Sequence, residues 1–370
     1  MSSRNDRYTY ETAMPGDAAE ILDILEEADF KGKISLTYTR RPDPYVSFKK
    51  EGREVTVFVS REKKANRITS IAASSINRMF LNGEPADVGY IFGLRVRKEY
   101  RRKYLLLPRG YEYIFRLHEE KNISFFLTTI LEENEVARKL LEKRRPSMPI
   151  YDYYGDYETY ALKTGHRARR GRGLRFRNAE ASDVNALIAF LHDQGRRFQF
   201  YPILESAEIM DPEASISYRN FYLLCDDNDE IAAAGTIWDQ RDYKQYLLNG
   251  YGGIYKYLYP VSFMFPLFGY PRLARPGSIL DFFTLSFWAV RDDDEDVFEC
   301  FLSHLSAITR QYSYFVLGMD TRHPLREALR RRPHLLYPGR MYLVYPYGDP
   351  PQEVRGIDRA RVPYLEIGRL

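Results

Sequence analysis

The stretch from Ala86 to Tyr113 constrains the fold more than any other part of this chain. Apolar residues alternate with other residues from Val88 to Val96, which is typical of a half-buried strand. A strongly basic turn follows at residues 97–103, and beyond Pro108 the apolar residues take helical spacing. A strand, a cationic turn and a helix in this order can hold a pyrophosphate, because helix N-termini and arginines attract anions.

The sequence LRVRKEYRRK at residues 94–103 resembles the central motif of GNAT acyltransferases, roughly L-x-V-x-P-x-x-R-x-x-G-x-G. In that family the strand pairs with the pantetheine arm of acyl-CoA and the loop wraps its pyrophosphate. Here the two glycines of the pattern are Tyr104 and Leu106, and bulky residues restrict close backbone approach. N-myristoyltransferases, tandem members of the superfamily, carry a glycine-poor loop, L-x-V-x-K-x-x-R-x-K-x-L. The residues that fit this variant are Leu94, Val96, Lys98, Arg101, Lys103 and Leu105.

The resemblance implies an acyl-CoA co-substrate, with acetyl-CoA as the expected donor, and a set of binding residues. A second family motif, N-x-x-A-x-x-x-Y, fits at Asn134 and Ala137. Its tyrosine, often the general acid that protonates the CoA thiolate, is Leu141 here, which cannot donate a proton. The implied cofactor-binding residues are Leu94, Arg95, Val96, Arg101, Arg102, Lys103, Tyr104, Leu105, Leu106 and Asn134.

Acyl transfer from a thioester to an amine needs positioning, deprotonation of the amine and a polarised carbonyl. By resemblance, splayed backbone N–H groups at Leu94 and Val96 are expected to donate hydrogen bonds to the thioester carbonyl. Gly93 marks a possible bulge beside them.

The sequence does not identify the general base. Asp87 and Glu112 are close to the motif, and Tyr90 could act through water, although such residues are more often surface or core residues. A minority hypothesis assigns the base to the carboxylate of Leu370, because N-myristoyltransferases use their terminal carboxylate.

From Leu174 the chain repeats its opening pattern, with a strand followed by a helix that starts at Asp183, as an earlier helix starts at Asp17. This weak repeat predicts an α+β fold of two GNAT-like acyl-CoA N-acyltransferase domains, each with a mixed sheet. The predicted parts are a first domain at 1–163, an Arg- and Gly-rich linker at 164–173, a degenerate second domain at 174–348 and a tail at 349–370. We expect Ile150–Leu162 and Arg340–Tyr345 each to close the sheet of its own domain.

The second domain carries two departures from the first. Residues 291–296 are acidic where a phosphate loop should be cationic, so we do not place acyl-CoA there. An aromatic insertion at 238–278 either covers the cleft of the first domain as a lid or packs on its own domain. In the linker, Arg167, Arg169, Arg170 and Arg172 form either an anion-binding patch or, more often for such runs, a solvated segment.

Composition limits the partners and the compartment. A net charge of +4 over 370 residues argues against general nucleic-acid binding. Two distant cysteines form no disulfide framework, which favours a reducing cytoplasm. The N-terminus lacks an apolar signal region, and the longest apolar run is far short of the roughly 20 residues of a membrane span. The six histidines show no metal-site spacing, so no metal is expected.

The leading hypothesis is a cytoplasmic tandem GNAT protein that acylates the amine of a small molecule or peptide. A second hypothesis is a catalytically silent binding protein with the same fold, which Tyr104, Leu106 and Leu141 favour. A third is transfer of a longer acyl or an aminoacyl group. The sequence leaves the acceptor, the acyl length and the oligomeric state open.

Overall fold

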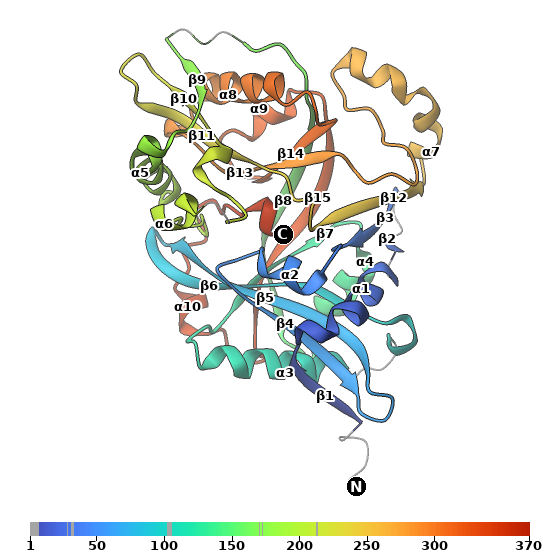
Figure 1. Cartoon of the computed structure of the whole chain (residues 1–370). Coiled ribbons are helices and arrows are strands. Elements are labelled where there is room, and N and C mark those ends of the chain that lie inside the picture. Colours follow the sequence, from blue (N-terminus) through green and yellow to red (C-terminus); the bar gives the residue numbers. More distant parts are fainter. Residues whose placement is uncertain are drawn as a thin grey trace.

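The computed structural model describes residues 7–27, 29–30, 33–101, 106–169, 171, 173–211 and 214–370. Its main feature is one mixed sheet of twelve strands that runs through both halves of the chain (Figure 1). In spatial order these strands are β1 (Tyr8–Thr12), β4 (Glu54–Glu62), β5 (Arg67–Leu81), β6 (Glu84–Val96), β7 (Phe126–Leu131), β15 (His334–Tyr345), β8 (Ile150–Lys163), β14 (Tyr314–Asp320), β13 (Phe282–Val290), β11 (Ile231–Trp238), β10 (Phe221–Cys225) and β9 (Arg175–Asn178).

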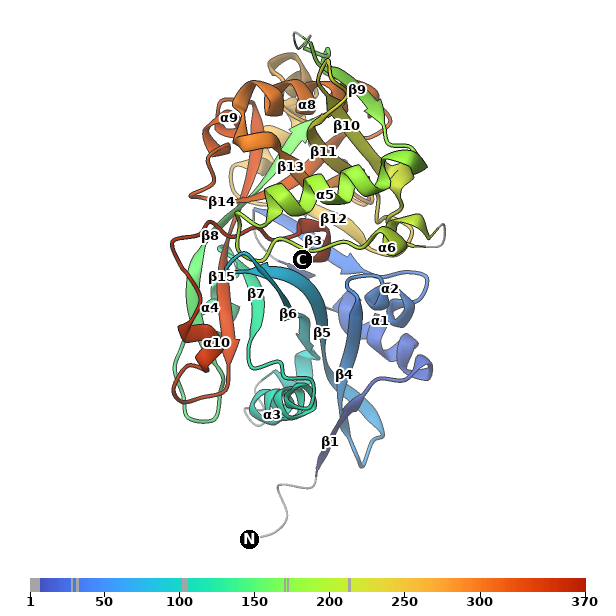
Figure 2. The same ribbon diagram turned by 90° about the vertical axis from the view of Figure 1, so that its left-hand side faces the viewer.

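Helices cover both faces of this sheet (Figure 2). In chain order they are α1 (Ala18–Glu27), α2 (Pro44–Lys49), α3 (Leu106–Glu119), α4 (Glu135–Leu141), α5 (Val184–Gly195), α6 (Ser206–Met210), α7 (Tyr255–Leu258), α8 (Glu295–Ile308), α9 (Arg326–Arg330) and α10 (Gln352–Arg355). In the first half, α1 and α2 pack against one apolar cluster and α3 and α4 against another, so the sheet separates two cores. The second half has one large core.

The α3 helix illustrates how the sequence pattern becomes structure. Tyr111, Ile114 and His118 fall on one face at helical spacing, and all three are buried against the sheet. The helix begins at Leu106, earlier than the pattern after Pro108 predicts, because proline is tolerated in the first turn, where its missing N–H has no helical partner.

The predicted repeat is confirmed by matching hydrogen bonds at the start of each half. The carboxylate of Asp17 accepts from the backbone N–H of Met14 at 2.8 Å, and that of Asp183 accepts from Glu180 at 2.7 Å. Each carboxylate also pairs with an arginine of its own half, Asp17 with Arg61 at 2.6 Å. The two halves therefore start with the same local structure.

The two halves exchange strands at the centre of the sheet. β15 lies between β7 and β8 and is antiparallel to both, while β8 also pairs with β14. The expectation that Ile150–Leu162 and Arg340–Tyr345 each close their own domain is therefore wrong, because each strand lies inside the shared sheet. Alternation of apolar residues shows which face of a strand is buried but does not identify its neighbour. The domain limits at 163 and 174 stay a prediction.

A second, three-stranded sheet joins the aromatic insertion to the first half. β12 (Gln245–Tyr251) pairs with β3 (Ile34–Thr39), which pairs with β2 (Asp29–Phe30). The alternative that the insertion packs only on its own half is therefore wrong.

Candidate functional site

The first half opens where the parallel strands β6 and β7 diverge. They pair at two positions, Gly89 with Phe126 and Tyr90 with Leu127. In the described part of the chain, β6 has no strand partner on this side from Ile91 to Val96. Backbone N–H and C=O groups along such an edge can pair with an extended ligand that carries amides.

The divergence is fixed by a side chain. The hydroxyl of Thr128 on β7 donates a hydrogen bond to the carbonyl oxygen of Ile91 at 2.8 Å. Both residues are buried, so this bond satisfies a carbonyl that the ladder no longer reaches.

A β-bulge lies next to the opening at Gly93. Phe92 pairs with Ala73 and Arg95 with Ile71, so β6 carries one extra residue between these pairs. Gly93 has a φ of +67°, where a side chain is strained, and an added Cβ would lie 3.1 Å from Phe48 Cε1. The bulge predicted at Gly93 is confirmed.

The second half repeats this geometry. β13 and β14 pair in parallel only near Phe283, and β13 bulges between Ser286 and Ala289, where Phe287 has a φ of +47°. By the register of the two openings, Phe287 corresponds to Gly93 and Trp288 to Leu94.

The opening of the second half is filled by residues 364–370 of the chain itself. The carboxylate of Glu366 accepts from the backbone N–H of Phe287 at 2.6 Å, and the hydroxyl of Tyr364 accepts from that of Trp288 at 3.3 Å. Glu366 is buried, and burial raises the pKa of its carboxyl group. N–H groups at this bulge thus reach acceptor oxygens.

The acidic turn of the second half has its own cation. Asp292 and Asp293 both pair with Arg197. The turn is therefore held by ion pairs within the chain.

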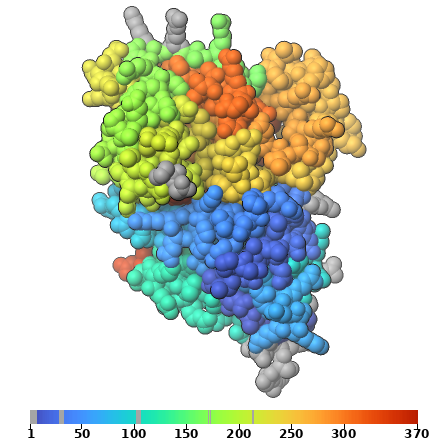
Figure 3. Space-filling model, viewed as in Figure 1, coloured from blue at the N-terminus to red at the C-terminus, as the bar shows by residue number. Residues whose placement is uncertain are grey.

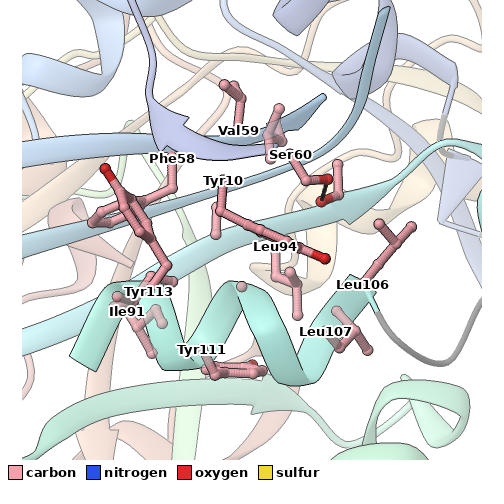
Figure 4. Close-up of a pocket in the computed structure, with 15 residues that line it drawn as sticks. Tyr10, Phe58, Val59, Ser60, Ile91, Leu94, Leu106, Leu107, Tyr111 and Tyr113 are labelled. Atoms are coloured by element: carbon pink, nitrogen blue, oxygen red, sulfur yellow. Dashed lines mark hydrogen bonds between the residues drawn. The ribbon is translucent and has the colours of Figure 1, made fainter. Parts of the chain in front are cut away.

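An apolar pocket lies between α3 and the sheet of the first half (Figure 4). Its cavity volume for the centre of a water-sized molecule is about 40 Å³, within about 440 Å³ of empty space that includes open solvent. Side chains from the sheet and from the helix point toward one another across it, and Leu94 on β6 lies among them. Its lining includes Tyr10, Phe58, Ile91, Leu94, Leu106, Leu107, Tyr111 and Tyr113. This space is suited to an apolar group beside the predicted acyl-CoA motif.

The described part of the basic turn, residues 97–101, contains a buried arginine and an exposed one. Arg97 is buried, and its Nε donates to the carbonyl of Ile68 at 2.8 Å. Arg101 is exposed, and its Nε donates to the carbonyl of Val96 at 3.2 Å. Arg102, Lys103, Tyr104 and Leu105 lie outside the described residues. Arg101 thus places a positive charge between the bulge and the start of α3.

Of the three candidate catalysts, only Tyr90 lies at the opening. Its hydroxyl hydrogen-bonds the Thr129 hydroxyl at 3.0 Å, and burial raises its pKa well above the usual range. Asp87 is exposed and pairs with Arg78 at 3.2 Å.

Glu112 and Asn134 have roles at the surface of helices. Glu112 is exposed on α3, 3.9 Å from Arg109. Asn134 caps α4, where its side chain accepts from the N–H of Ala137 at 3.2 Å. Leu141 is buried in the core under α4.

Two further binding predictions fall on β6 itself. An Arg95 guanidinium N–H donates to the carbonyl of Leu94 at 2.8 Å, and burial lowers the pKa of Arg95. Val96 pairs with Ser70 at the end of the β5–β6 ladder. Their contacts with a cofactor stay predictions.

A buried ion cluster at the centre of the molecule escaped the sequence analysis. The Glu51 carboxylate lies 2.8 Å from Arg40 and 3.0 Å from Lys244. All three side chains are almost fully buried. Lys244 also donates to the carbonyl oxygen of Leu370 at 2.8 Å. Lys244 and Leu370 are far in sequence from Arg40 and Glu51, and no local pattern marks the cluster.

The cluster borders the opening of the first half. After burial, the negative charge of Glu51 contributes to raising the pKa of Tyr90. Leu370, partly buried, packs against the same core as Tyr90. Its role as a base stays a prediction.

In the described ranges, no group of three or more His, Cys, Asp or Glu side chains is placed so that it could hold a metal ion. His118 is buried and bonds the Ser74 hydroxyl at 2.9 Å and the Ile114 carbonyl at 2.8 Å.

No family model and no curated protein matches this sequence. Solved structures do match the fold. N-myristoyltransferase of Saccharomyces cerevisiae with bound myristoyl-CoA aligns with a TM-score of 0.61 and 11% identity, over 96% of this chain and 84% of that chain. A GCN5-related N-acetyltransferase from Anabaena variabilis aligns with a TM-score of 0.53 and 12% identity, over 91% of this chain and 72% of that chain. The chain therefore has the tandem GNAT fold, with two acyltransferase-like halves that share one sheet.

Proposed function

We propose that this protein is an acyl-CoA-dependent N-acyltransferase. Its first half binds acyl-CoA between β6 and β7 and transfers the acyl group to an amine of a small molecule or peptide. The observation that carries the proposal is the contrast between two equivalent openings. One contains the tail of the chain, whereas in the other no described segment outside the sheet accepts a hydrogen bond from the N–H groups of Gly93 or Leu94.

The bulge supplies the group that polarises the thioester. In the second half, the N–H groups of Phe287 and Trp288 donate to oxygens of Glu366 and Tyr364. The corresponding N–H groups in the first half belong to Gly93 and Leu94. A thioester carbonyl placed there would receive hydrogen bonds that strengthen as its oxygen becomes negative.

Tyr90 supplies a proton at the same opening. Because burial raises its pKa, its phenol is neutral at physiological pH. A neutral phenol can donate a proton to the departing CoA thiolate, and the proton that the acylated amine loses then restores the phenol. Tyr90 thus takes the role that the resemblance assigned to the position of Leu141.

The apolar pocket favours a donor longer than acetyl-CoA as a second candidate. Its lining is mostly apolar, although it includes Ser60, Ser70 and three tyrosines, and Leu94 of the bulge belongs to it. The yeast N-myristoyltransferase of the same fold binds myristoyl-CoA. A medium or long acyl chain in the pocket would gain about 0.8 kcal/mol for each buried methylene group.

Calorimetric titration with acetyl-CoA and with decanoyl-CoA tests the proposal. We expect binding by the native protein, loss of binding in Gly93→Val and normal binding in Gly16→Ala, since an added Cβ at Gly16 meets no atom within 4 Å. Tighter binding of decanoyl-CoA would select the longer donor. No binding of either CoA ester would refute the proposal.

Turnover separates the enzyme from a silent binding protein. The native protein is incubated with the CoA ester it binds and a panel of amines and peptides, and release of free CoA thiol is followed. Release that depends on the amine supports acyl transfer. Binding without release across the panel would favour a silent scaffold instead.

A further inference from the structure

The surface of the aromatic insertion is unusually apolar. Of the 18 large apolar side chains exposed in the described part of the chain, nine lie between Ile254 and Ile279. Tyr257, Leu267 and Phe268 expose 77%, 79% and 66% of their surface. The others are Ile254, Val261, Phe263, Met264, Tyr270 and Ile279. Exposed apolar side chains gathered in this way mark an interaction surface.

This surface is built on an ordered support. It comprises α7 and the 3₁₀ helix η5 (Tyr259–Phe268), which stand at one side of the molecule (Figures 1 and 3). The Tyr259 ring stacks on Tyr251 at 5.2 Å, and Lys163 donates to the carbonyl of Pro266 at 3.1 Å. Ser262 is buried on the inner side. The inner contacts fix the backbone, and the apolar side chains project outward.

The charged residues of the segment itself have one sign. Residues 243–280 contain no Asp or Glu, in a chain with 51 acidic residues. The segment has three exposed basic residues, Lys256, Arg272 and Arg275. Within the described residues, none of the three forms an ion pair. An apolar surface flanked by unpaired cations matches the interface of an anionic membrane.

We propose that the α7–η5 surface binds the face of an anionic lipid bilayer. The phenylalanine and leucine side chains would enter the boundary between headgroups and acyl chains, and the tyrosines would lie at headgroup level. Lys256, Arg272 and Arg275 would contact lipid phosphates. In the described part of the chain no helix is long and apolar enough to cross a membrane, so the surface lies on the bilayer.

A second copy of the chain is a poorer partner for this surface. A two-fold symmetric dimer places the same patch on both sides of its interface. The three cations Lys256, Arg272 and Arg275 of one copy would then meet the same patch of the other copy, which has no carboxylate in the segment to offset them. Phospholipid phosphates offset these charges.

Vesicle co-sedimentation tests the proposal. Vesicles of phosphatidylcholine with phosphatidylglycerol are compared with vesicles of phosphatidylcholine alone. We expect at least tenfold stronger binding to the anionic vesicles. Added salt should weaken this binding because it screens the cations.

The triple variant Phe263→Ser/Leu267→Ser/Phe268→Ser should bind the anionic vesicles at least tenfold more weakly. The variant Lys256→Gln/Arg272→Gln/Arg275→Gln should lose the preference for phosphatidylglycerol. The control Leu131→Ser/Val136→Ser, which changes exposed residues elsewhere, should bind like the native protein.

A tryptophan at the surface reports lipid contact directly, so the test does not depend only on variants that could unfold. Both native tryptophans, Trp238 and Trp288, are buried, so Phe263→Trp adds an exposed probe. Its emission should shift to the blue only with anionic vesicles. The proposal is overturned if the native protein does not sediment with them, or if the control loses binding as much as the apolar variant. Self-association without lipid that the apolar variant abolishes would assign the surface to a second copy instead.

Discussion

The hydroxyl of Thr128 lies 2.8 Å from the carbonyl oxygen of Ile91, at the point where β6 and β7 part. A parallel ladder would continue with a backbone donor at this carbonyl. The threonine provides the donor from its side chain, so the strands can diverge without leaving a buried carbonyl unpaired.

Thr128→Val should therefore destabilise the protein by about 1–3 kcal/mol, because the carbonyl of Ile91 loses its donor in a buried position. Urea unfolding followed by circular dichroism measures the change. Thr56→Val on β4 is the control, since its hydroxyl bonds no partner among the described residues, and it should change stability little. Equal effects of the two variants would contradict the role of Thr128.

Gly93→Ala tests the bulge without a large side chain. The positive φ and the approach to Phe48 should cost roughly 1–3 kcal/mol of stability. CoA-ester affinity should fall further than stability explains, because the N–H groups at the bulge shift. Titration under conditions where the variant is folded, checked by near-ultraviolet circular dichroism, separates the two effects. Native affinity in the folded variant would contradict a bulge donor.

Tyr90→Phe should lower kcat by about 100-fold, because it removes the proton donor for the thiolate, and leave donor affinity unchanged. Since the pKa of Tyr90 is raised above its ordinary 10.0, the phenol stays protonated from neutral pH up to about pH 10. The native kcat should therefore show no loss from this group below pH 10. Tyr222→Phe, in the second half, is the control. An unchanged kcat in Tyr90→Phe would exclude the tyrosine as acid.

Glu366 makes stability depend on pH. Its pKa is raised in the folded state by burial, so its stabilising contribution is complete below the unfolded value of 4.5 and is lost as pH rises through the folded pKa. Glu366→Gln keeps an oxygen acceptor for Phe287 but does not titrate. The free energy of unfolding of the native protein, relative to this variant, should fall as pH rises from 4.5. A constant difference between pH 4.5 and 8 would contradict burial of the carboxyl.

Glu51→Gln should destabilise the protein by about 3–5 kcal/mol, because it removes the counter-charge of buried Arg40 and an ion-pair partner of buried Lys244. Chemical unfolding at neutral pH measures the loss. Glu135→Gln removes an exposed partner of Lys139 and should have no measurable effect. A small effect of Glu51→Gln would mean that water reaches the cluster.

Local features of the first half could be predicted from the sequence because their causes are local. The alternation in β6, the glycine at the bulge and the helical spacing in α3 each depend on neighbouring residues. The turn at Asn82 and Gly83 has positive φ at both residues, as the Asn-Gly pair predicts. The resemblance to the GNAT motif then identified the strand that borders the opening.

Features that join distant segments could not be predicted in this way. The residues that fill the second opening carry no periodic pattern, and their fit depends on Gly368, where an added Cβ would lie 2.2 Å from the Trp238 ring. Lys244, an ion-pair partner of Glu51, comes from the second half of the chain. Of the candidate catalysts, only Tyr90 lies at the opening. The others were chosen because they are close to the motif in sequence, and closeness in sequence does not show whether a side chain, such as exposed Asp87, faces the opening.

The exchange of β8 and β15 has a consequence for synthesis. During translation, β7 and β8 leave the ribosome long before β15, the strand that separates them in the sheet. Until then the first half has an unfilled position at its centre and exposed strand edges, which are prone to pair with other chains. We therefore expect the sheet of the first half to be completed only after β15 is synthesised, and slow translation of the last part of the chain would lengthen the time for which these edges are exposed.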